Sequence, residues 1–163
     1  MDIKLKNKFL YYGKYKIKCS IGKRGITSKK REGDEKTPCG VFAFKSLLYR
    51  KDRITKIKSA LNKTIIKKNM GWCDSPFSKY YNKLIRFPFK QSAEKLWLKE
   101  NVYDVVIIIN YNLKPIIINK GSAIFIHIAK KNYEPTKGCI AVSKKDILEL
   151  ISKINKKTKI LIN

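Results

Sequence analysis

Histidine and paired cysteines are scarce in this chain. One histidine and four cysteines occur in 163 residues, and no two cysteines form a Cys-x-x-Cys pair. A structural zinc ion needs four Cys or His ligands at short spacings, so this scarcity argues against a tetrahedral zinc site. A chain of this length can fold without disulfide bonds. We therefore expect free thiols, one of them reactive.

Long apolar segments are also missing. The longest uninterrupted run, Val105 to Ile109, is far too short to span a bilayer. The first twenty residues contain no apolar stretch long enough for the core of a signal peptide. We expect no transmembrane segment, and the sequence shows no export signal.

Acidic residues are few. The chain has 12 Asp and Glu against 38 Lys and Arg, a formal net charge of +26. Such a charge attracts polyanions such as nucleic acid or acidic wall polymers. The lysines are spread along the whole chain, however, as a general bias in composition would also produce. We predict non-specific, salt-sensitive binding to anionic polymers and no specific nucleic-acid site.

Hydrophobic periodicity predicts a mainly β protein with a few helices. Residues 22–40 hold glycines and a proline among charges, which is typical of a long ordered loop. Ser143 and Asp146 form a weak capping-box variant before a helical apolar repeat. Two further helices are expected at 59–68 and 92–100. The expected strands lie within 8–21, 41–44, 104–110, 116–118, 123–129 and 159–162.

The segment 124–142 carries the chemistry. Because alternate strand residues share a face, His127 should lie opposite the isoleucines of its own strand. Cys139 follows after a loop that contains Pro135. A return strand could then place the thiol beside the imidazole, where an imidazolium lowers a thiol pKa and the histidine exchanges protons near neutral pH. From spacing alone, a structural histidine and a core cysteine remain the alternative.

The backbone before the cysteine suits an acyl-transfer site. Gly138 has no Cβ and allows close approach of a substrate. The main-chain amides of Lys137, Gly138 and Cys139 are candidates for an oxyanion hole.

Three blocks of the sequence resemble the L,D-transpeptidase family. His127 followed by Thr136-Lys137-Gly138-Cys139 is similar to the family pattern of His, a loop and Ser/Thr-x-Gly-Cys. Residues 32–42 resemble the segment with Thr-Pro-x-Gly-x-Phe, and residues 121–127 resemble the strand that carries the histidine. Gly71 to Asp74 and Tyr103-Asp104 also resemble compact members. The likeness covers roughly residues 15–152.

This resemblance implies a single catalytic domain over residues 1–163, folded as a β-sandwich of mixed sheets with a few short helices. It implies that Cys139 attacks a peptidoglycan stem peptide and that His127 is the general base. Ile128 matches the carbonyl that orients the histidine, and Thr136 braces the loop. It implies no metal or organic cofactor, a monomeric bacterial enzyme, and action in the periplasm or cell envelope.

One position departs from the pattern. Ala141 stands where the common motif has an arginine, so Lys137, Arg86 or Arg31 would have to supply positive charge. Two alternatives to transpeptidation stay open: L,D-carboxypeptidase or other hydrolysis at the same Cys-His site, and a non-catalytic basic module that binds an anionic polymer.

The remaining candidates are given structural roles. We expect packing roles for Cys19, Cys39 and Cys73, since none has a histidine in its segment. For Asp74 we expect a turn cap rather than a contact with a substrate amine.

Overall fold

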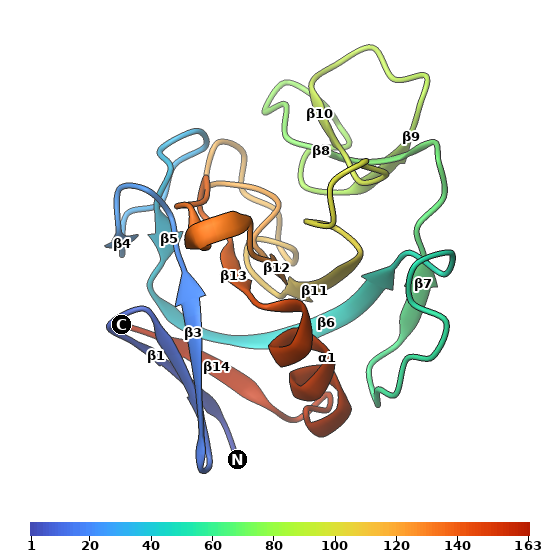
Figure 1. Ribbon diagram of the computed structural model, residues 1–163. Helices are drawn as coiled ribbons and strands as arrows, with labels where there is room; N and C mark the ends of the chain where they lie inside the picture. The colour runs from blue at the N-terminus through green and yellow to red at the C-terminus, as the bar shows by residue number, and fades with distance from the viewer.

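Most strands belong to one nine-stranded sheet in the computed structural model, which describes residues 1–163. In spatial order the strands are β11 (Val105–Ile109), β12 (Phe125–Ile128), β13 (Ile140–Val142), β3 (Tyr15–Ser20), β2 (Phe9–Tyr12), β1 (Ile3–Lys6), β14 (Lys159–Ile162), β6 (Gly40–Tyr49) and β7 (Lys63–Ile65). β11 also pairs with β6, which closes the sheet into a barrel-like ring and leaves β7 outside it (Figure 1). The expected mainly β class is confirmed, but this closed sheet is not clearly a sandwich.

The segment 8–21 is a hairpin and not a single strand. Gly13 has a φ of +56°, which allows the tight turn between β2 and β3. In β3, Ile17 and Cys19 are buried while the intervening lysines are exposed. The predicted alternation is therefore present, and it gives the sheet one buried and one solvated face.

The larger hydrophobic core lies on the isoleucine side of β12. Ile124, Ile126 and Ile128 join it, as the alternation predicted. The only α-helix, α1 (Lys144–Lys153), buries Ile147, Leu150 and Ile151 in the same core. Its Ser143 cap is confirmed: Ser143 Oγ accepts a hydrogen bond from the Asp146 amide at 3.1 Å and donates to Asp146 Oδ2 at 2.6 Å.

A smaller core lies on the opposite face of β11 and β12. Phe125, Val106 and Ile108 pack there against Trp72. Trp72 belongs to a three-stranded sheet that forms a separate layer at the top of Figure 1. This sheet consists of β8 (Met70–Cys73), β9 (Leu84–Arg86) and β10 (Ala93–Lys95). It covers the face that carries His127.

Three predicted elements are wrong. Residues 59–68 form no helix but a turn followed by β7, which pairs with β6. Residues 92–100 form no helix because β10 pairs with β8 instead. Residues 116–118 form no strand, since the Asn112 side chain holds both the amide and the oxygen of Ile117 in a loop.

The loop 22–40 contains a short parallel pair, β4 (Ile26–Thr27) with β5 (Thr37–Pro38). Thr37 and Pro38 are buried, whereas Cys39 is turned outward and exposed. The expectation that Cys39 packs in the interior is therefore wrong. All four cysteines are free thiols, and Cys19 and Cys73 are buried. No helix of the structure has both the length and the apolar content to cross a membrane.

Candidate active site

Parallel pairing of β12 with β13 brings the two candidate residues to one face. His127 lies opposite Ala141, and Ile126 lies opposite Ile140. Cys139, one residue before β13, is therefore beside Phe125, whose amide donates a hydrogen bond to Cys139 Sγ at 3.4 Å. From strand spacing and rise, the Cα atoms of Cys139 and His127 are about 8 Å apart on a diagonal. Side chains of this size can meet across that distance.

The Cys139 thiol is held by a main-chain contact. Its Sγ donates a hydrogen bond to the oxygen of Ala123 at 3.0 Å. The side chain is neither fully buried nor fully exposed. In this resting state the thiol hydrogen points to a carbonyl and not to the imidazole.

The His127 ring is held in one orientation. Its Nδ1 lies 2.9 Å from the oxygen of Ile128, and the residue is 6% exposed. A carbonyl only accepts hydrogen bonds, so in the neutral ring Nδ1 carries the hydrogen and Nε2 keeps a free lone pair. Glu134 does not contact the ring; it is exposed and lies 3.8 Å from Lys130 Nζ.

Burial keeps both groups neutral. It lowers the pKa of His127 to about 4 and raises the pKa of Cys139 to about 12. Glu94 raises the thiol pKa further, while the Phe125 amide and Lys30 lower it. The expected imidazolium-activated thiolate is therefore not the resting state, because desolvation disfavours both charged forms.

The loop before Cys139 is fixed by threonine hydroxyls. Thr136 Oγ1 donates to the oxygen of Cys139 at 2.6 Å and accepts from the Gly138 amide at 3.1 Å. Thr37 Oγ1 donates to the oxygen of Gly138 at 2.9 Å. Gly138 has a φ of +138°, and a Cβ there would lie 2.9 Å from the oxygen of Lys36. Glycine is needed for this contact within the chain.

A family model for the L,D-transpeptidase catalytic domain, YkuD, matches residues 2–162. The chain belongs to this family. No curated protein and no solved structure matches the chain. Members of the YkuD family are in general acyltransferases of the cell envelope that act on peptidoglycan.

In this YkuD domain, only two of the three main-chain amides predicted for the oxyanion hole are free to bind a substrate oxygen. The Gly138 amide already donates to Thr136, whereas the amides of Lys137 and Cys139 donate to no group of the protein. One of these N–H groups belongs to Cys139 itself and the other lies two residues before it. They are the donors that remain for a negatively charged oxygen.

An aromatic wall that the sequence did not reveal covers His127. The Tyr103 ring meets the imidazole edge-on, with centroids 5.3 Å apart, and its hydroxyl donates to Glu94. Burial raises the pKa of Glu94, and the nearby Asp74 raises it further. Asp74 Oδ1 is itself buried without a hydrogen-bond partner, so no contact supports the expected turn cap through this oxygen.

In this YkuD domain, the residue at the position of the common-motif arginine is buried. Ala141 is 1% exposed and lies between His127 and Ser20 in the sheet. The proposed substitutes Lys137, Arg86 and Arg31 are all exposed, and none of them is hydrogen-bonded to Cys139 or His127. The buried cation that influences the thiol is Lys30, which the sequence did not single out. No group of three or more His, Cys, Asp or Glu side chains converges as a metal site.

Proposed function

We propose that residues 1–163 form one L,D-transpeptidase domain that acts on peptidoglycan stem peptides through a thioacyl-enzyme on Cys139. The observation that carries the proposal is the shared face of Cys139 and His127, with a free thiol on a residue of intermediate exposure and an imidazole whose Nε2 is left as an acceptor. Membership of the YkuD family supports the substrate class.

The first half-reaction begins with a neutral pair. The thiol turns from the Ala123 oxygen toward the imidazole, and Sγ attacks the carbonyl carbon of the L-centre residue. The thiol proton passes to His127 Nε2, which acts as a general base. The Lys137 and Cys139 amides stabilise the oxyanion. The C–N bond then breaks, the terminal D-amino acid takes the proton from His127, and a thioester to Cys139 remains.

The second half-reaction regenerates the thiol. An amine of a neighbouring stem attacks the thioester carbon and gives its proton to His127 Nε2. The C–S bond breaks, and the proton returns to Sγ. The product is a cross-link with a new amide bond, or an exchanged terminal residue when a free D-amino acid is the acceptor. Such a reaction places the enzyme in the periplasm or cell envelope.

The test is incubation of the protein with tetrapeptide stems, with and without an acceptor amine, followed by mass spectrometry of the products. We expect D-amino acid release and an acceptor-dependent cross-linked product, both lost in Cys139→Ser. The matched control is Cys39→Ser, which removes an exposed thiol outside the site and should keep full activity. Release of D-amino acid with no cross-linked product would reject the transferase in favour of an L,D-carboxypeptidase.

A second candidate function is a basic binding module. A cleft of about 590 Å³ is lined by Lys8, Lys18 and Lys23 and by no acidic side chain. If binding to an anionic polymer were the whole function, Cys139→Ser would leave it intact and added salt would abolish it. The proposed enzyme uses this charge only to stay on an anionic wall.

A further inference from the structure

Lys30 is a buried ammonium group beside the candidate site. Of the 38 basic residues, only Lys30 and Arg50 are classed as buried, at 7% and 4% exposed. Arg50 is paired with Asp52 and stacks on Trp97. A buried charge is costly unless it is paired and hydrogen-bonded, so the contacts of Lys30 indicate what it stabilises.

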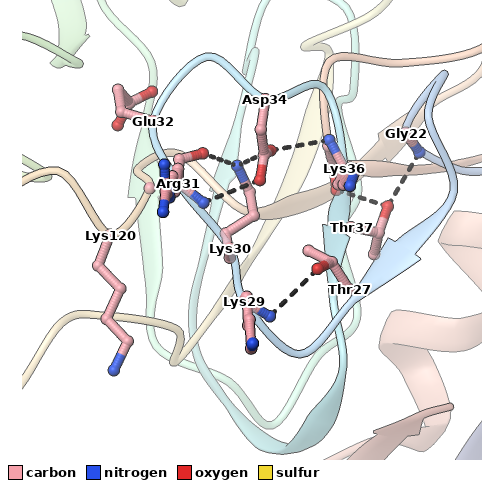
Figure 2. A network of polar contacts seen from close by, with 12 residues as sticks. Gly22, Thr27, Lys29, Lys30, Arg31, Glu32, Asp34, Lys36, Thr37 and Lys120 are labelled. Carbon is pink, nitrogen blue, oxygen red and sulfur yellow. Dashed lines mark hydrogen bonds and ion pairs between the residues drawn. The ribbon is translucent and has the colours of Figure 1, made fainter.

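The ammonium group of Lys30 is held by two acceptors. Nζ donates to Asp34 Oδ1 at 2.6 Å and to the oxygen of Arg31 at 2.7 Å (Figure 2). An ammonium group has three hydrogens, so one remains without a partner in the protein. Asp34 in turn accepts hydrogen bonds from the amides of Arg31 and Lys36.

The ion pair is connected through Lys36 to Gly138, the residue before the proposed nucleophile. Asp34 Oδ1 accepts from the Lys36 amide at 2.9 Å. The oxygen of Lys36 is the atom that a Cβ on Gly138 would meet at 2.9 Å, and the next residue, Thr37, donates to the oxygen of Gly138. The position of the loop at Gly138 therefore depends on how Asp34 holds Lys36.

The ion pair is also connected through Gly121 to Ala123, whose oxygen accepts the thiol hydrogen. The side chain of Lys30 lies against Gly121, where a Cβ would come within 3.0 to 3.3 Å of its Cγ, Cε and Nζ atoms. Gly121 is two residues before Ala123, whose oxygen accepts the hydrogen bond of the Cys139 thiol. The Gly121 amide donates to the Tyr81 hydroxyl, which donates to Glu32 of the same loop as Lys30.

We propose that the buried Lys30–Asp34 ion pair is a positioning device for Cys139, which fixes the backbone on both sides of the thiol and provides the buried positive charge of the site. Ala141 supplies no cation from β13, so Lys30 is the basic residue that is buried against this region. Its charge favours the thiolate and the oxyanion over their neutral forms, in opposition to burial and Glu94.

The test measures alkylation of Cys139 by iodoacetamide and needs no peptidoglycan substrate. The inference rests on the proposed role of Cys139 as nucleophile, but thiol reactivity can be measured even if no transfer to a stem peptide occurs. All proteins carry Cys39→Ser, which removes the exposed competing thiol. The rate at Cys139 is followed by mass spectrometry from pH 7 to 10, and circular dichroism reports the fold.

Loss of either partner of the ion pair should slow the reaction of Cys139. Lys30→Met removes the cation, which raises the thiol pKa, and slows alkylation at pH 8 by about threefold or more. Lys30→Arg keeps the charge and restores the rate. Asp34→Asn leaves one oxygen for the contacts that the carboxylate makes with Lys30, Lys36 and Arg31, so the loop at Gly138 loosens and alkylation also becomes slower. The exposed neighbour Lys29 is the matched control, and Lys29→Met leaves the rate unchanged.

A purely structural role gives a different result. If the ion pair only stabilises the fold, the folded variants Lys30→Met and Asp34→Asn unfold at lower temperature but react like Lys29→Met, and this result overturns the proposal. If Lys30→Met does not fold, Asp34→Asn decides: a slower reaction supports the proposal, and an equal or faster one rejects it.

Discussion

The main-chain oxygen of Ala123 accepts the hydrogen bond of the Cys139 thiol at 3.0 Å. This contact occupies the thiol hydrogen that His127 is proposed to take, so the thiol must turn away from Ala123 before proton transfer. A thiol in such a state stays protonated and resists oxidation, because the thiolate is the reactive form. The resting site therefore pairs a neutral thiol with a neutral imidazole.

Acylation of the thiol should occur at one residue. A carbapenem-type acylator should give a single adduct, on Cys139, which Cys139→Ser abolishes. His127→Ala should slow its formation by about a hundredfold or more, since general-base catalysis contributes at least that much. Intact-protein mass spectrometry with peptide mapping measures both effects. A main adduct on exposed Cys39 would contradict the site assignment.

The stability of the fold should depend on the single histidine between pH 5 and 7. Burial lowers the pKa of His127 from 6.5 to about 4, so in this range the unfolded chain binds the proton more tightly than the folded chain. Stability therefore falls as the pH drops below 6.5, by about 2 kcal/mol at pH 5 relative to pH 7.

Urea unfolding at the two pH values measures this difference. In His127→Asn the histidine contribution is absent, and only the shared carboxylate effects remain. An equal loss of stability in the parent protein and in His127→Asn would show that the imidazole is not buried in its neutral form.

Gly138→Ala should disturb the nucleophile. The new Cβ would lie 2.9 Å from the oxygen of Lys36, at a φ of +138°. Gly33 also has a positive φ, +72°, but a Cβ there meets nothing within 4 Å, so Gly33→Ala is the control for backbone strain alone. We expect a cost of about 1 kcal/mol for Gly33→Ala from strain, and a larger one for Gly138→Ala.

Thermal unfolding and the alkylation rate of Cys139 measure these two changes. Gly138→Ala should slow alkylation, whereas Gly33→Ala should not. Equal effects on stability and rate would mean that the contact with Lys36 is unimportant.

The sequence was sufficient to predict the centre of the site but not its supports. His127 and Cys139 are near each other in the chain, and strand alternation alone placed the histidine opposite the isoleucines. Glu94 was assigned to a helix, because nothing local shows that β10 pairs with β8. Lys30 looks like any other lysine in this basic chain, since its burial depends on the distant segment around Gly121. The run 116–118 is β-branched but is held in a loop by one asparagine.

The common-motif arginine should not be tolerated at position 141. Ala141 is 1% exposed and lies between His127 and Ser20, and neither of these cross-strand neighbours is acidic. An arginine there would be a buried charge without a partner, which costs about 3 kcal/mol or more. Ala141→Ser adds a single oxygen and is the matched control, with an expected cost of about 1 to 2 kcal/mol. Thermal unfolding of the two variants compares them, and comparable stability would show that an arginine can reach solvent from β13, leaving Lys30 as one of two cations that the site can accommodate.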